Sequence, residues 1–267
     1  LYSNKVENSS KILNNSLMKS CVSYYVKEEA NYPYRDYMED CNKIFDGFMN
    51  NPNFGLFTLY DGHGGKDTSN HIKDRIPEIF QQTILKYQNN IEPNMEKILT
   101  ETFESCDDEL KTKPWAYYTG STACLIFTIK NGENYTIYSA NAGDSRRLSY
   151  DHKASDLSEI NRIKKYGGTV FNGRIFGSLA VSRAFGDYEL KQFGVLATPY
   201  YSKTNTIKGD KYIIIASDGV WDVLNDEDIL SLAKVYGKTS KELCEMIVKV
   251  SLEKKSFDNI SVIVVEL

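Results

Sequence analysis

Two β-rich segments joined by a four-residue turn place the strongest limit on the fold of this chain. Residues 122–129 (TACLIFTI) and 134–140 (NYTIYSA) are rich in β-branched and aromatic side chains, and the KNGE between them is typical of a hairpin turn. Similar runs occur at 21–26, 54–60, 211–217 and 259–267. Strands that follow one another through a short turn pair antiparallel, so the sequence predicts antiparallel sheets rather than a regular alternation of strand and helix.

Three segments carry helical signals. Residues 95–110 place apolar side chains on one face at spacings of three and four. A second helix is expected at 155–168, opened by a capping box of Asp156 and Glu159 and closed by a glycine pair. A third is expected at 239–255, ending in two lysines. Two antiparallel sheets packed face to face with helices outside accommodate this order, so we expect an α+β fold with a central antiparallel β-sandwich flanked by helices on both sides, in four layers (αββα).

Composition favours one domain that folds on its own. The chain has 267 residues, of which 41% are hydrophobic and 25% charged, enough to bury a substantial core. Residues 1–19 are polar and rich in Asn and Ser, and we expect a flexible arm there. Residues 20–267 are then expected to form a single domain.

Charge and cysteine content exclude several classes of protein. The 32 basic and 36 acidic residues give a net charge of -4, so no nucleic-acid partner is expected. No apolar run approaches the roughly 20 residues of a membrane-spanning helix. The five cysteines form no CxxC pair, which argues against a disulfide framework or a zinc site and favours an intracellular protein. The cytoplasm is the expected location, with the nucleus and the membrane periphery as open alternatives. A monomer is the expected state.

Acidic residues follow or precede the predicted strands. One such residue is ordinarily a turn or cap residue, but five strand ends carrying carboxylates indicate more. The residues concerned are Asp61, Asp144, Asp218, Asp258 and the pair Glu39 and Asp40. Packed strands bring their ends to one edge of a sandwich, where clustered carboxylates repel one another unless cations hold them. Oxygen ligands without cysteine indicate magnesium or manganese rather than zinc.

The segment LYDGHGG (59–65) fits such a metal site. Asp61 is expected to bridge two ions, and Gly62, which lacks a side chain, allows its carbonyl oxygen to approach one of them. Two ions that share a water make it a nucleophile at neutral pH. His63 can then donate a proton to a leaving oxygen.

Eight short motifs together resemble the metal-dependent serine/threonine protein phosphatases of the 2C class (PPM family), in that family's order. They are RDYMED (35–40), DGHGG (61–65), TGSTA (119–123), NAGDSR (141–146), YGGTV (166–170), LAVSRAFGD (179–187), ASDGVWD (216–222) and DNISVIVV (258–265). The resemblance covers nearly the whole chain from about residue 20. It implies phosphorylated proteins as substrates, a β-sandwich between helical layers, and two Mn²⁺ or Mg²⁺ ions.

The resemblance also implies roles for individual residues. The implied metal ligands are Glu39, Asp61, Gly62 through its carbonyl, Asp218 and Asp258. The family's additional, weaker metal position matches Asp144, shared with Asp218. Asp40 and Asn259 match residues that support the ligands without binding the ions themselves.

The implied mechanism is in-line attack of a metal-bound water on phosphorus, without a phosphoenzyme. Arg35 matches the family's phosphate-binding arginine, and a guanidinium can grip two phosphate oxygens at once. His63 then protonates the departing serine or threonine alkoxide. For Arg183 and Asp187 we expect an ion-pair or turn role in the structure rather than a role in catalysis.

Two alternatives stay open at this stage. A catalytically weak pseudophosphatase would keep the fold as a binding or regulatory module, although all the implied ligands and His63 are present. A two-metal hydrolase of small phosphoesters would use the same chemistry, because the site recognises phosphate and not the group attached to it. Phosphatases with a cysteine nucleophile are excluded, since no cysteine is followed by an arginine six positions later.

Overall fold

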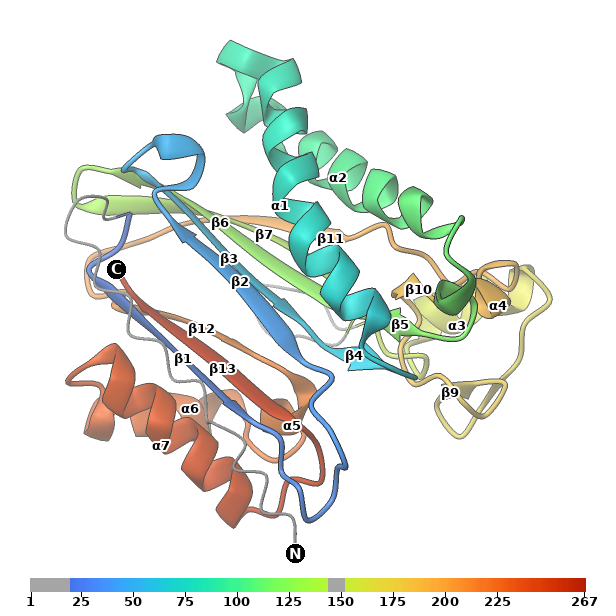
Figure 1. Ribbon diagram of the computed structural model, residues 1–267. Helices are drawn as coiled ribbons and strands as arrows, with labels where there is room; N and C mark the ends of the chain where they lie inside the picture. Colours follow the sequence, from blue (N-terminus) through green and yellow to red (C-terminus); the bar gives the residue numbers. More distant parts are fainter. Residues whose placement is uncertain (1–19, 144–151) are drawn as a thin grey trace, which may run out of the picture.

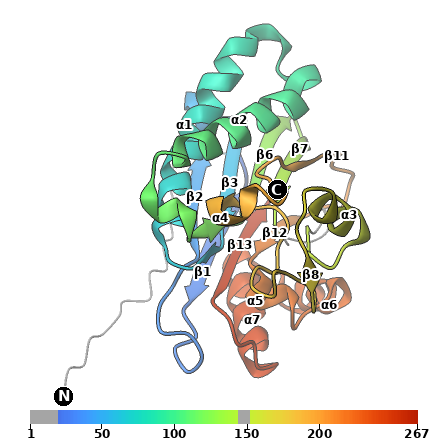
Figure 2. The same ribbon diagram turned by 90° about the vertical axis from the view of Figure 1, so that its right-hand side faces the viewer.

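A computed structural model describes residues 20–143 and 152–267, which form four layers (Figure 1). Two antiparallel sheets pack face to face, and helices cover the outer face of each sheet. Figure 2, turned by 90°, shows the same stacking of helices, sheets and helices. The predicted fold class is therefore confirmed.

The larger sheet has five antiparallel strands in the order β11-β7-β6-β3-β2. They are β2 (Cys41–Asp46), β3 (Phe54–Tyr60), β6 (Ala123–Asn131), β7 (Asn134–Ala142) and β11 (Tyr200–Asn205). The predicted hairpin joins β6 to β7, with Asn131 opposite Asn134. Gly132 in its turn has a φ of 68°, a conformation that glycine adopts without strain.

The smaller sheet has three antiparallel strands in the order β1-β13-β12. They are β1 (Ser23–Glu29), β12 (Tyr212–Ala216) and β13 (Ile260–Glu266). Short strands complete the structure: β4 (Gly62–His63), β5 (Gly120–Ser121) and β10 (Phe185–Gly186) form one sheet, and β8 (Val170–Phe171) pairs with β9 (Arg174–Ile175).

Side chains along the central strands alternate between two apolar layers. In β13, Ile263 and Val265 pack between the two sheets, whereas Val262 and Val264 pack toward the helices outside. Strand β3 alternates in the same way, with Phe57 between the sheets. Because both faces of each sheet are covered, the strands read in the sequence as continuous apolar runs.

The helices divide between the two outer faces. Helices α1 (Asp67–Tyr87) and α2 (Met95–Leu110) pack on each other and on the five-stranded sheet. Helix α7 (Ser240–Glu253) packs on β1 and β13, with α5 (Asp218–Trp221) and α6 (Asp226–Tyr236) beside it. Within residues 20–143 and 152–267, no helix combines the length and apolarity needed to cross a membrane.

The remaining helices are short. Helices α3 (Leu157–Lys165) and α4 (Tyr188–Lys191) belong to the segment between β7 and β11. The 3-10 turns are η1 (Phe48–Asn50), η2 (Gln88–Asn90), η3 (Glu92–Asn94) and η4 (Pro114–Tyr117).

The predicted helices are present, but one local detail is wrong. Helix α2 has the predicted bounds, and α7 begins after Thr239, whose hydroxyl accepts a hydrogen bond from the Glu242 backbone. The capping box of α3 does not form, because Asp156 makes no side-chain cap hydrogen bond. Glu159, its expected partner, turns inward to two arginines instead.

Candidate functional site

The acidic residues predicted to form a site lie at one end of the sandwich. Glu39 precedes β2 by two residues and Asp61 follows β3 directly, and these strands pair with Cys41 opposite Tyr60. Asp218 opens α5 shortly after β12, and Asp258 lies two residues before β13. Figure 1 shows β4 and α5 at this end of the two sheets. Asp144, the remaining predicted ligand, lies outside the described residues.

Asn259 joins the two sheets at this end. Its Oδ1 accepts a 2.9 Å hydrogen bond from the backbone N–H of Glu39. Its Nδ2 donates to the carbonyl oxygens of Ala30 and Tyr37, at 2.8 and 3.1 Å. Because this amide is buried, its three hydrogen bonds hold the loop before β2 against the start of β13. Asn259 thus positions Glu39, whereas its role in supporting metal ligands stays a prediction.

Glu39 is also tied to the DGHGG loop. Its Oε1 accepts a 2.7 Å hydrogen bond from the Gly65 N–H, and its carbonyl oxygen accepts one from the Ser69 hydroxyl at 2.9 Å. A Cβ on Gly62 would lie 2.7 Å from the Ser69 hydroxyl oxygen and 2.8 Å from the Glu39 carbonyl oxygen. A side chain at Gly62 therefore does not fit, and this loop approaches Glu39 through backbone alone.

The position of Asp61 is fixed through its backbone. Its carbonyl oxygen accepts hydrogen bonds from the Thr122 N–H at 2.8 Å and the Ser121 hydroxyl at 3.1 Å. These contacts tie the end of β3 to the TGSTA segment, so two of the sequence motifs meet here.

Asp40 is a buried carboxylate next to Glu39. Burial raises its pKa to about 7, although the nearby hydroxyls of Ser261 and Ser217 act in the opposite direction. Among the described residues its Oδ2 has no hydrogen-bond partner. A buried carboxylate oxygen of this kind is suited to a nearby cation.

The donors at this end of the sandwich fit hard divalent cations in their chemistry. They are carboxylate and carbonyl oxygens, they include a glycine with no room for a side chain, and an orphaned carboxylate lies beside them. Within the described ranges, no three His, Cys, Asp or Glu side chains lie close enough together to hold one ion. Asp258 is instead ion-paired with Arg35, whose side chain is 43% exposed. The predicted phosphate-binding arginine and one predicted metal ligand therefore lie in contact.

His63 makes a contact that the sequence did not predict. Its Nε2 lies 2.7 Å from Oδ2 of Asp187. Strand β4 carries His63 and pairs with β5, which pairs in turn with β10, just before Asp187. The ion-pair or turn role expected for Asp187 is therefore present, and its partner is the predicted proton donor.

Arg183 has the expected ion pair. Its Nη2 lies 3.1 Å from Oε1 of the buried Glu159, and its Nη1 donates to the carbonyl of Thr198 at 2.9 Å. Arg162 makes a second ion pair with the same carboxylate at 2.6 Å. This cluster fixes α3 to the segment that leads to Asp187.

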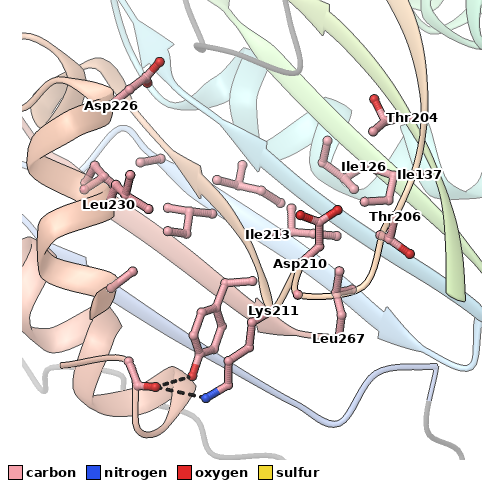
Figure 3. A pocket seen from close by; sticks show the side chains of 18 of the residues that line it. Ile126, Ile137, Thr204, Thr206, Asp210, Lys211, Ile213, Asp226, Leu230 and Leu267 are labelled. Atoms are coloured by element: carbon pink, nitrogen blue, oxygen red, sulfur yellow. Dashed lines mark hydrogen bonds between the residues drawn. The ribbon is translucent and has the colours of Figure 1, made fainter. Parts of the chain in front are cut away.

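A cavity of about 660 Å³ lies away from these residues (Figure 3). Its walls come from both sheets and from α6, and they include Ile126, Ile137, Ile213 and Leu230. Strand β12, the edge strand of the smaller sheet, also lines it. None of the predicted site residues in the described part of the chain lines it.

Comparisons with known proteins agree with the motifs. The family model described as "Protein phosphatase 2C" matches residues 25–260. The chain is 33% identical over 253 residues to "Protein phosphatase 2C homolog 1" of Schizosaccharomyces pombe, covering 90% of this chain and 72% of the relative. It is 30% identical over 264 residues to the Saccharomyces cerevisiae protein of the same name, covering 91% and 92%.

Solved structures show the same fold. A phosphatase from Toxoplasma gondii superposes with a TM-score of 0.78 at 20% identity, covering 94% of this chain and 95% of the other. A serine-threonine phosphatase 2C from the same organism gives 0.76 at 19% identity, covering 97% and 99%. The family match and the two yeast relatives show that the chain belongs to the protein phosphatase 2C family of serine/threonine protein phosphatases.

Proposed function

We propose that this phosphatase hydrolyses phosphoserine and phosphothreonine in proteins by direct attack of water, with two Mn²⁺ or Mg²⁺ ions bound at the end of the sandwich. The observation that carries the proposal is the set of hydrogen bonds by which Asn259 and the DGHGG loop hold Glu39 where the two sheets meet. The proposed ligands are Glu39, Asp61, the Gly62 carbonyl, Asp218 and Asp258, with Asp144 and Asp218 at a third, weaker position. When bound, such ions activate water as a nucleophile and offset charge on phosphate oxygens.

The protein's own residues bind and orient the phosphate. Arg35 is half exposed and reaches Asp258, so its guanidinium lies at the edge of the proposed metal site. Its fork can grip two phosphate oxygens and offset the charge that develops on them during the reaction. His63 is the proposed acid that donates a proton to the serine or threonine oxygen as the P–O bond breaks.

The direct test is phosphate release from a phosphothreonine peptide, with Mn²⁺ and then with excess chelator. The wild type is compared with Asp218→Asn, which keeps the size of the side chain but removes its charge. The matched control is Asp210→Asn, because Asp210 is an exposed acid whose side chain accepts a hydrogen bond from the nearby Ile207 N–H. We expect activity that needs both the metal and Asp218 and that tolerates the control. Appreciable turnover by Asp218→Asn would remove Asp218 from the ligand set.

The same assay, run on the peptide and on p-nitrophenyl phosphate, separates the other candidates. A pseudophosphatase would release no phosphate from either of these substrates with Mn²⁺ present. A hydrolase of small phosphoesters would turn over p-nitrophenyl phosphate but no phosphopeptide. The proposal requires turnover of the peptide.

A further inference from the structure

The contact between His63 and Asp187 joins two segments that are 124 residues apart in the sequence. From this contact we infer that Asp187 is a positioning residue, which holds the His63 ring so that it can protonate the leaving oxygen of the substrate. The inference rests on the proposed function, because it concerns the proton donor of that reaction. It goes beyond the ion-pair or turn role that the sequence alone suggested for Asp187.

The Asp187 carboxylate does not have the usual function of an aspartate at the start of a helix. Asp187 is the N-cap of α4, where such a side chain commonly accepts a hydrogen bond from the first turn. Here it makes no cap hydrogen bond. The side chain is 8% exposed and pairs with His63, whose side chain is 30% exposed. The buried Asp187 thus supports His63, which solvent and substrate can reach.

The backbone around Asp187 is held in an unusual conformation. Its φ of 51° lies in the left-handed region, which costs a residue other than glycine about 1 kcal/mol or more. Its N–H donates to the Thr119 carbonyl at 3.0 Å, and the N–H of Gly186 donates to Oδ1 of Asp107 at 3.0 Å. These bonds fix the turn that aims the carboxylate at His63.

Gly120 provides the space in which the two side chains meet. This residue lies opposite His63 in the pairing of β4 with β5. A Cβ built on Gly120 would overlap both Oδ2 of Asp187 and Nε2 of His63. The glycine of the TGSTA motif therefore permits the contact.

The contact determines which ring nitrogen can act on the substrate. The Asp187 carboxylate accepts a hydrogen bond from Nε2 when that nitrogen carries a proton, and this contact fixes the orientation of the ring. We assign the acid role to Nδ1, the other ring nitrogen. As the water oxygen bonds to phosphorus and gives up one proton to solvent, the P–O bond to the alcohol breaks and the Nδ1 proton moves to the departing oxygen. Solvent returns a proton to Nδ1 after the alcohol leaves, while Nε2 stays bonded to Asp187.

The test compares two substrates whose leaving groups differ in their need for a proton. An alkoxide leaving from a phosphothreonine peptide needs an acid, whereas p-nitrophenolate leaves as a stable anion. We expect Asp187→Gly to lower kcat on the peptide about 100-fold, near the lower end of what a general acid contributes, with a much smaller loss on p-nitrophenyl phosphate. Glycine suits the positive φ at this position, and so does asparagine in Asp187→Asn, so both variants should fold.

A double-mutant cycle shows whether Asp187 acts through His63. If it does, Asp187→Gly has no further effect on the peptide in a His63→Ala background. The control Glu189→Gln changes an exposed acid two residues away and should match the wild type. Equal losses on both substrates, or a full additional loss in the His63→Ala background, would overturn the positioning role alone. A wild type without turnover of either substrate would overturn the proposed function and this inference together.

Discussion

Replacing Glu159 with glutamine should test how strongly one buried carboxylate holds the segment that carries Asp187. Glu159 is 3% exposed and accepts from Arg162 at 2.6 Å, from Arg183 at 3.1 Å and from the Ser182 hydroxyl. The substitution keeps the shape of the side chain and removes its charge. It leaves two guanidinium groups near one neutral amide.

The pKa of Glu159 gives the size of the effect. Burial would raise this pKa, but the hydrogen bonds from Arg183, Ser182 and Arg162 outweigh burial and lower it from 4.5 to about 2. Lowering the pKa from 4.5 to about 2 corresponds to about 3 kcal/mol of folding stability at pH 7. Breaking a buried ion pair by removing one partner costs about 3–5 kcal/mol in other proteins, which agrees with this value.

The sign of the pH dependence follows from the same shift. Because the folded pKa lies below the unfolded one, this stabilisation is present above pH 4.5 and disappears as the pH falls toward 2. Urea unfolding of the wild type and of Glu159→Gln is measured at pH 7 and at successively lower pH. We expect a difference of about 3 kcal/mol at pH 7 that shrinks with acidification.

An exposed ion pair provides the control. Glu253 lies 3.8 Å from Lys249 on α7 and is 60% exposed, so Glu253→Gln should change stability by less than about 0.5 kcal/mol. A difference for Glu159→Gln below about 1 kcal/mol at pH 7 would refute the reasoning, since a surface pair gives as much. So would a difference that stays constant down to low pH, because it would not come from the charge.

Three further predictions concern pH, packing and metal. Burial and the charge of Arg183 lower the pKa of His152 to about 4, so the folded protein favours the neutral ring and its stability should fall by up to about 3 kcal/mol as the pH drops from about 6.5 to 4. Urea unfolding should show a weaker fall for His152→Asn, and an equal fall would contradict the assignment to His152. A Cβ on Gly219 would overlap the Asn259 carbonyl, so Gly219→Ala should cost about 1–3 kcal/mol by overpacking; an unchanged melting temperature would count against this contact. Mn²⁺ at about 100 times its Kd should add about 2.7 kcal/mol to wild-type stability by mass action; a melting temperature insensitive to Mn²⁺ and chelator would argue against the metal site.

The pattern of apolar residues was sufficient to predict the strands and helices that depend on their own sequence alone. The run 54–60 is apolar on both faces and forms β3 with the predicted bounds, because both faces of its sheet are covered. Residues 95–110 form α2 because their apolar residues lie on one face. Helix α1 was not predicted: it contains Pro77 within its length, a residue that ordinarily breaks a helix. Its buried face against α2 and the five-stranded sheet compensates for that loss.

The position of the acidic residues could be predicted from the sequence, whereas the contact that orients His63 could not. An acid next to an apolar run is assigned to a strand end by the run itself, so Glu39 and Asp61 could be placed at one end of a sandwich from sequence. The Asp187 carboxylate has no such local signal. In sequence it is an aspartate after a glycine at the start of a short helix, and that position favours a cap or a turn equally well. Its contact with His63 depends on three short strands from different parts of the chain meeting side by side, so only the folded chain reveals it.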